Sequence, residues 1–265
     1  MKRRAAARPR ATRLRQAWPW CVVALLSCGL TTLAILPAAW LTPQVARLTG
    51  ARIALVGASG TVWRGAATLQ LSAGPDARTA TLLPGRLQWR THVLPLLLGT
   101  LRIDLSHDEA MSEPVRLDAR PAGATLSAGS MRLPVSLFEG LGAPFNTLAL
   151  NGELRADWTP WRVTAGRSAG QATLTLRDTR SAVSRVAPLG DYRVRIEAAA
   201  GTFDLALSTL KGPLLLDGSG RGDGAGFRFD GTARAEADRL PALRGLIGLL
   251  GPLQRDGEAR LTFRR

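Results

Sequence analysis

The sequence predicts a mainly β protein, in which an N-terminal transmembrane helix precedes an elongated, curved antiparallel β-sheet domain with one or two short helices. Three observations predict this class. An uncharged segment lies near the N-terminus, apolar and polar residues alternate over most of the remaining chain, and turn-forming residues occur between the alternating segments. With 265 residues, 46% of them hydrophobic, the chain is long enough to bury a core in one or two domains.

Residues 1–16 form a basic tail. Seven Lys or Arg residues and no acidic residue lie between Lys2 and Arg15, so the tail carries seven of the fifteen net positive charges. A basic chain can indicate nucleic-acid binding, but the downstream Arg residues alternate with apolar residues, as Arg193 and Arg195 do, and form no basic helix. No nucleic-acid partner is therefore expected.

Residues 17–41 are predicted to form a transmembrane helix. No charged residue occurs between Arg15 and Arg47, and about 20 helical residues span the hydrocarbon core of a bilayer. The alternative is a cleaved signal peptide, but its apolar region is typically about 7–15 residues long and this segment is longer. The positive-inside rule then places the tail in the cytoplasm and residues 42–265 in the periplasm, anchored in the cell inner membrane.

Small and mildly polar residues form a stripe along this helix. Its members lie three or four positions apart, which is one helical turn: Ala24, Ser27, Cys28 and Thr31. Such a stripe permits close packing against another membrane helix. Small residues are also common in any apolar helix, and both interpretations stay open. Cys21 and Cys28 share the helix, so no disulfide is expected in the β region.

The β region shows apolar residues at every second position, which is the signal for strands with one buried face. The alternating segments are Leu69–Leu71, Leu87–Val93, Leu101–Leu105, Val115–Ala119, Leu148–Leu150, Leu154–Trp158, Ala172–Leu176, Tyr192–Ala198, Phe203–Leu207, Phe227–Phe229 and Ala259–Phe263. Turns are expected at Gly74-Pro75-Asp76, Pro84-Gly85, Pro121-Ala122-Gly123, Asn151-Gly152 and Asp230-Gly231. Spacings this short leave no room for parallel crossovers and favour an antiparallel meander.

Helices are expected in three places: a connector over Pro43–Leu48, a turn over Ser136–Gly142 and an apolar helix over Pro241–Leu250. The Gly-rich run Asp217–Gly226 is interpreted as a hairpin tip, because one copy containing an Arg is weak support for a calcium-binding repeat.

No catalytic, cofactor or metal site is predicted. The β region contains no Cys, and its two His residues, His92 and His107, are too few for a zinc site. A triad of a Ser with His107 and Asp104 is formally possible, but no strained Ser motif accompanies it. The segment His107-Asp108-Glu109 is interpreted as a solvated loop. The chain is thus not expected to be an enzyme.

The most distinctive motif contains Gly57, Gly60, Thr61, Trp63 and Gly65. It is interpreted as a Gly-containing turn leading into a strand that carries Trp63, with Gly65 at a bulge or close approach. It lacks the GxGxxG spacing of nucleotide-binding loops. Related strand-plus-aromatic patterns at Gly85–Trp89 and Gly152–Trp158 suggest weak internal repetition.

These features together resemble the type II secretion system protein N family. The resemblance rests on the basic tail, the early anchor, the Gly57–Gly65 motif, Trp89 before the apolar Val93–Leu97, and the closing segment Gly251–Phe263. It implies a bitopic inner-membrane component of the machine that exports folded proteins across the outer membrane. The implied partners are other inner-membrane or periplasmic subunits and membrane lipid, and the family is not known for an active site.

A second resemblance leaves another function open. The succession of strands and turns is also similar to AsmA-type envelope proteins, which handle lipids. In that case the apolar face of the sheet would line a groove that binds or transfers lipid. The two hypotheses are therefore a partner-binding subunit of the secretion system and a lipid-binding envelope protein.

Overall fold

The structure is a computed structural model that describes residues 11–72, 80–136, 145–223, 226–254 and 256–264, with only the backbone for residues 11–19, 145 and 146. The chain forms two compact units, residues 1–37 and 38–265. The predicted turn at Gly74-Pro75-Asp76 and nearly all of the predicted helical turn at Ser136–Gly142 lie outside the described residues.

The first unit contains one helix, α1 (Ala11–Ala34). It ends before Leu41 because Pro37 has no backbone N–H to donate and disfavours helical geometry at the preceding residue, Leu36. Within the residues whose side chains the structure describes, no helix is both long enough and apolar enough to cross a membrane.

The second unit begins with two short helices. Residues Ala38–Trp40 form a 3-10 helix, η1, and the predicted connector is the helix α2 (Leu41–Leu48). Both contact the first strands of the sheet. The sheet itself contains sixteen strands among the described residues, and every strand pair is antiparallel, which confirms the predicted mainly β, antiparallel class.

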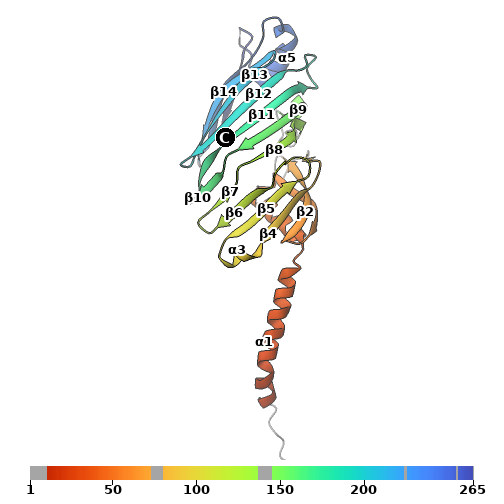
Figure 1. The fold of residues 1–265 in the computed structure, drawn as a ribbon. Coiled ribbons are helices and arrows are strands. Elements are labelled where there is room, and N and C mark those ends of the chain that lie inside the picture. The colour runs from red at the N-terminus through yellow and green to blue at the C-terminus, as the bar shows by residue number, and fades with distance from the viewer. Residues whose placement is uncertain (1–10, 73–79, 137–144, 224–225, 255, 265) are drawn as a thin grey trace, which may run out of the picture. The chain divides into compact units, whose positions relative to one another are not determined.

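We divide the strands into an N-terminal and a C-terminal sheet (Figure 1). The N-terminal sheet consists of β1 (Ile53–Gly60), β2 (Arg64–Ser72), β3 (Ala80–Leu82), β4 (Leu87–His92), β5 (Leu101–His107), β6 (Val115–Arg120), β7 (Gly123–Leu126) and β10 (Trp161–Thr164). The C-terminal sheet consists of β8 (Gly129–Pro134), β9 (Leu150–Trp158), β11 (Arg167–Ser181), β12 (Gly190–Ala199), β13 (Thr202–Lys211), β14 (Leu214–Gly222), β15 (Phe227–Ala235) and β16 (Ala259–Arg264).

The two sheets are joined at two short breaks between consecutive strands. Strand β11 pairs with both β9 and β10, and β9 and β10 are separated only by Thr159 and Pro160. Likewise, Ser127 and Ala128 separate β7, which pairs with β10, from β8, which pairs with β9. Because Pro160 cannot donate a backbone hydrogen bond, it is suited to the interruption between the two strands.

The apolar face of the N-terminal sheet is covered by η1 and α2. Buried Ala38, Leu55, Ala67 and Trp89 form its core, and partly buried Leu41 and Val45 of α2 pack against them. Strands one residue out of register would place these side chains in water, so the core determines the register of β1, β2 and β4.

The apolar face of the C-terminal sheet is covered by α5 (Leu240–Leu250), which confirms the helix predicted at Pro241–Leu250. Leu243 and Ile247 of α5 are fully buried against Ala233 and Ala259. Buried Tyr192 donates its hydroxyl proton to the carbonyl oxygen of Leu214 at 3.0 Å, and burial raises the pKa of this phenol.

Five local predictions are wrong. Val93 begins the helix α3 (Val93–Leu97) instead of ending a strand, and Leu148 ends the helix α4 (Phe145–Leu148). The Asn151-Gly152 and Asp230-Gly231 pairs lie inside β9 and β15. Asp230 and Gly231 pair with both β14 and β16, and Asn151 pairs with Arg180 of β11 beside a register shift, so strand pairing overrides the turn preference of two residues. Most of the Gly-rich run at Asp217–Gly226 likewise belongs to β14.

Candidate functional site

The Gly57–Gly65 motif forms the end of β1, a tight turn and the start of β2. Thr61 organises the turn: its Oγ1 accepts hydrogen bonds from the backbone N–H groups of Trp63 at 3.3 Å and Arg64 at 3.2 Å. Gly60 has φ +86°, and a Cβ there would lie 2.5 Å from the Arg64 carbonyl oxygen. Gly57, with φ +62°, lies in a bulge between Val56 and Ser59.

Part of the interpretation of this motif needs correction. Trp63 lies in the turn and not in a strand, because the strand ends at Gly60 and resumes only at Arg64. The predicted close approach at Gly65 is confirmed: this glycine is paired with Trp89 of β4, and a Cβ at Gly65 would collide with the indole ring. The structure thus brings the five motif residues into one β1–turn–β2 unit.

Strand β4 holds the turn in place from the side. The Trp89 indole N–H donates to the carbonyl oxygen of Thr61 at 3.2 Å, and the Thr91 N–H donates to that of Trp63 at 2.7 Å. The Thr91 hydroxyl donates to the Val62 carbonyl oxygen at 3.0 Å. Three bonds from one strand therefore satisfy three successive carbonyl groups of the turn.

The same arrangement recurs where the two sheets join. Trp158 of β9 is paired with Gly129 of β8, its ring occupies the space of the missing side chain, and its indole N–H donates to the Ser127 carbonyl oxygen at 2.9 Å. Trp89 and Trp158 end the two segments in which the sequence suggested a repeated strand unit. The two tryptophans have the same role, which is to cover a cross-strand glycine.

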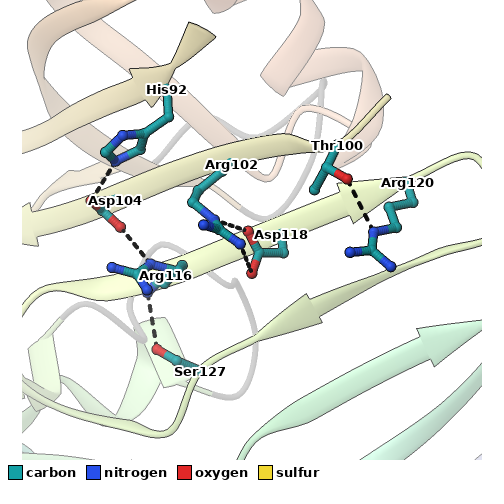
Figure 2. Close-up of polar contacts among 8 residues, drawn as sticks. All are labelled: His92, Thr100, Arg102, Asp104, Arg116, Asp118, Arg120 and Ser127. Atoms are coloured by element: carbon teal, nitrogen blue, oxygen red, sulfur yellow. Dashed lines mark hydrogen bonds and ion pairs between the residues drawn. The ribbon is translucent and has the colours of Figure 1, made fainter. Parts of the chain in front are cut away.

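The opposite face of the N-terminal sheet is polar, and Asp104 of β5 lies at the centre of its ion pairs (Figure 2). His92 Nε2 lies 2.7 Å from one carboxylate oxygen of Asp104, and the Arg116 Nε–H donates to the other at 3.0 Å. The hydrogen bond from His92, followed by that from Arg116, lowers the pKa of Asp104.

Two further contacts continue this row along β5 and β6 (Figure 2). The Arg102 Nε–H donates to Asp118 Oδ1 at 2.6 Å, and the Arg120 Nε–H donates to the hydroxyl oxygen of buried Thr100 at 3.1 Å. Alternation places charged residues of both signs on one face, as the sequence predicted for solvated strand faces.

A hollow of about 630 Å³ lies on this polar face, beside the motif. Arg64, Arg90, Gln88, Asp104 and Ser106 contribute polar side chains to its lining. Arg64 and Arg90 are directly paired across β2 and β4, and like charges in that position repel each other. Asp104 of β5 lies opposite Arg90 on the other side, so the hollow holds two guanidinium groups beside one carboxylate, and guanidinium groups can bind an anionic group.

The catalytic triad of a Ser with His107 and Asp104 is not formed. His107 and Asp104 lie on opposite faces of β5, and Asp104 pairs with His92 instead. His107 is buried, so the prediction of a solvated loop at this residue is wrong. Its Nδ1 accepts the backbone N–H groups of Glu109 and Ala110 at 3.3 and 3.1 Å, and desolvation lowers its pKa.

Metal ligands do not cluster in the part of the chain that the structure describes: no three His, Cys, Asp or Glu side chains there could hold an ion together. The predicted helix-packing residues Ala24, Ser27, Cys28 and Thr31 lie on α1. The Thr31 hydroxyl donates to the Ser27 carbonyl oxygen at 2.8 Å, within the helix. Their role in packing against another helix stays a prediction.

A row of aromatic residues on the apolar face of the C-terminal sheet was not expected from the sequence. Phe203, Phe227 and Phe229 lie over Gly222, Gly220 and Gly218 of β14, and Phe227 stacks on Phe203 with ring centroids 5.4 Å apart. The period-two spacing of these glycines was the available signal, because glycine at every second position marks one face of a strand.

The β1 and β16 edges of the sheet differ. The β1 edge is interrupted by the bulge at Gly57, a feature that discourages pairing with another strand. The β16 edge pairs regularly with β15 over Ala259–Arg264 and is bridged on its other side at Ala259 by Leu253. Within the described residues, Leu261–Phe263 have no strand on that outer side.

Comparison with known proteins gives one family. The model of the family described as "Type II secretion system (T2SS), protein N" matches residues 51–262, which is most of the chain and contains the motif, the polar face and both sheets. The chain belongs to the type II secretion system protein N family. No curated protein and no solved structure matches it.

Membership of the protein N family connects this chain with type II secretion and, through it, with the other subunits of that system. The match begins at Ala51, just before β1, and ends at Thr262 in β16. The family region thus coincides with the β-sheet unit described above.

Proposed function

We propose that this protein is a non-enzymatic inner-membrane subunit of the type II secretion system that contributes to export of folded proteins across the outer membrane through protein–protein contacts. The observation that carries the proposal is the protein N family match over residues 51–262. The geometry agrees with a binding role, since the polar side chains form ion pairs along an open sheet face rather than an enclosed reaction site.

The proposed placement follows from the charge distribution. Of residues 17–41, the segment before Ala38 would cross the inner membrane, because Ala38 and Leu41 pack against the sheet. The basic tail would lie in the cytoplasm and the β-sheet unit in the periplasm. Support comes from the seven basic residues of the tail and the absence of charge between Arg15 and Arg47. The stripe of Ala24, Ser27, Cys28 and Thr31 would pack against a membrane helix of another subunit.

The proposed contact surface for a periplasmic subunit is the outer edge of β16. Backbone groups on the edge of a sheet can bind an extended segment of another protein as an additional strand. Leu261 and Phe263 alternate with Thr262 there, and Phe263 is exposed. The bulged β1 edge is less suited to the same role.

Photo-crosslinking in whole cells tests this surface. A benzophenone amino acid at Thr262 is expected to give adducts with another secretion-system subunit, whereas the same amino acid at Arg195, an exposed position on the interior strand β12, is expected to give few. Recovery of no secretion-system subunit from either position would count against the proposal. Equal yields from both would move the contact away from the β16 edge.

A second candidate is a lipid-binding function similar to that of AsmA-type proteins. The aromatic row favours it: Phe203, Phe227 and Phe263 lie close together on the face that α5 covers elsewhere, and Phe263 is 53% exposed. A photoactivatable phospholipid incorporated with the full chain into vesicles tests it. Adducts on the peptides that carry these three residues would support a lipid groove, and adducts confined to residues 17–41 would exclude one on this face.

A further inference from the structure

The segment Val93–Leu98, which we name the α3 tip, exposes contiguous apolar side chains. The exposed fractions are 50% for Val93, 77% for Leu94, 38% for Leu96, 77% for Leu97 and 86% for Leu98. No charged residue occurs from Val93 to Leu101. Scattered exposed leucines are ordinary on a protein surface, but a contiguous group of this kind marks a surface that contacts a partner or a membrane.

The α3 tip has a defined backbone conformation. Its chain reversal is closed by backbone hydrogen bonds from Leu98 N–H to the Pro95 carbonyl oxygen at 3.0 Å and from Gly99 N–H to that of Leu96 at 2.9 Å. Gly99 adopts φ +74°, a conformation that favours glycine. Thr100, which follows, is buried and accepts the Arg120 hydrogen bond. The α3 tip is therefore a defined turn at the end of β4 (Figure 1), and its apolar side chains are exposed.

The first residue of the second unit packs against β4, the strand that leads into the tip. The first residue of the unit, Ala38, is fully buried in the cluster that contains Trp89. Trp89 supports the β1–β2 turn, and its strand ends at His92, directly before the tip. Trp40, two positions after Ala38, is 64% exposed at this entry point.

Covalent connection limits how far Ala38 can be from the proposed anchor. Helix α1 ends at Ala34, and a chain extends by at most about 3.6 Å per residue. The four residues from Ala34 to Ala38 therefore reach no further than about 14 Å. If the helix before Ala38 crosses the inner membrane, the part of the N-terminal sheet that Ala38 contacts lies close to the lipid headgroups.

Two arginines beside the tip can bind a phosphate group. Arg90 is on β4, just before the tip, and is paired with Arg64 across the hollow on the polar face. Asp104 lines the same hollow, where its carboxylate is held by His92 and Arg116. A phosphate oxygen accepts hydrogen bonds from guanidinium groups well. Apolar side chains next to arginines match the acyl chain and the phosphate of a phospholipid.

We propose that the α3 tip inserts into the periplasmic interface of the bilayer that anchors the chain, while Arg64 and Arg90 bind phospholipid phosphate. The tip is thus a second membrane contact, which orients the β-sheet unit relative to the membrane. This inference rests on the membrane anchor of the proposed function, and it adds a lipid-binding site that is separate from the apolar face of the C-terminal sheet.

Fluorescence quenching by lipid tests the insertion in the full chain. Cys21 and Cys28, the two cysteines of the chain, are replaced by Ala, and Leu97→Cys is labelled with an environment-sensitive dye. The protein is reconstituted in phosphatidylethanolamine and phosphatidylglycerol vesicles with a quencher on the acyl chains. The matched control is Leu210→Cys, an exposed leucine on β13.

We expect several-fold more lipid quenching and a blue-shifted emission at Leu97 compared with Leu210. Arg64→Gln together with Arg90→Gln should reduce the quenching at Leu97 and leave Leu210 unchanged. A Leu97 label that aqueous iodide quenches as strongly as the Leu210 label would overturn the inference.

Flotation in alkaline carbonate separates this failure from failure of the anchor. A chain that floats with the vesicles while its Leu97 label stays in water overturns the tip contact and leaves the anchor intact. A chain that does not float overturns the anchor and the tip contact together. Neither outcome depends on crosslinking from Thr262, which tests the secretion-system contact.

Discussion

The two sheets of the β-sheet unit are stabilised in different ways. In the C-terminal sheet, α5 buries Leu243 and Ile247 in a cluster of nine buried side chains, and β11 extends over 15 residues. In the N-terminal sheet, η1 and α2 cover a cluster of four, and the longest strand has nine residues. There, the ring of Trp89 packs over Gly65, and its N–H group bonds to the β1–β2 turn.

The difference indicates that the two sheets have different roles. Apolar burial against a helix provides much of the stability of the C-terminal sheet. The N-terminal sheet instead holds a turn, a polar face with paired arginines and the exposed α3 tip in defined positions. Surface features that bind partners need such support more than they need a large core. Four predictions test this comparison.

The largest effect is expected for Ile247→Ala, which empties a fully buried position in α5. Such a change destabilises a protein by about 2–5 kcal/mol. Chemical unfolding of the detergent-solubilised chain, followed by circular dichroism, measures it. Leu249→Ala, at a 52% exposed position on the same helix, should cost less than about 0.5 kcal/mol.

Tryptophan fluorescence in the same experiment tests whether the two sheets unfold separately. Five of the seven tryptophans lie between Trp18 and Trp89. Trp161 is in the N-terminal sheet and only Trp158 is in the C-terminal sheet, so the emission reports mainly on the N-terminal sheet and the residues before it. We expect Ile247→Ala to shift the circular dichroism transition more than the fluorescence transition. Equal shifts would show that the two sheets unfold as one cooperative structure.

Gly65→Ala should be the next most damaging change, because the new Cβ collides with the Trp89 ring and lies 2.7 Å from the Ser59 carbonyl oxygen. Overpacking of this kind costs about 1–3 kcal/mol. Unfolding monitored by tryptophan fluorescence measures the loss. Gly129→Ala, under Trp158, is expected to behave in the same way. Unchanged stability in both variants would contradict the role assigned to the glycine–tryptophan contacts.

The pH dependence of stability should reveal buried His107. Desolvation lowers its pKa in the folded chain, although Asp108 and Glu109 partly oppose the shift. The unfolded chain therefore binds a proton first, and stability should fall as the pH drops below the ordinary value of 6.5. One such group changes the free energy of unfolding by at most about 1.4 kcal/mol per pH unit.

His107→Asn should flatten that pH dependence, because the Asn side-chain oxygen can still accept the Glu109 and Ala110 N–H groups but does not titrate. His92 is the other histidine of the chain, and the His92→Asn variant should keep the slope below pH 6.5 that belongs to His107. A slope that survives in His107→Asn would assign it to another group.

The smallest effect is a gain. Gly245 lies inside α5, and a Cβ there would meet no atom within 4 Å. Gly245→Ala should stabilise the C-terminal sheet by about 0.5–1 kcal/mol, because alanine is a better helix former. Circular dichroism during chemical unfolding measures the gain. A loss of stability would show that the helix requires a glycine at this position.

Much of the fold was predictable from local pattern. Alternation identified most of the strands, and the apolar run at Pro241–Leu250 identified α5, because a period of two or of 3.6 residues follows from which face of an element is buried. The family motif was found as a unit, and the close approach at Gly65 was predicted. The placement of Trp63 was not, because two residues decide where a tight turn ends.

The sequence by itself determined the antiparallel sheet, the position of α5 and the family of the chain, since these depend on patterns within short segments. Only the tertiary structure decided that Trp89 covers Gly65, that Asp104 pairs with His92 and that Asp230-Gly231 stays within a strand. The physical reason is that these outcomes depend on contacts between separate strands, whose pairing no local period specifies.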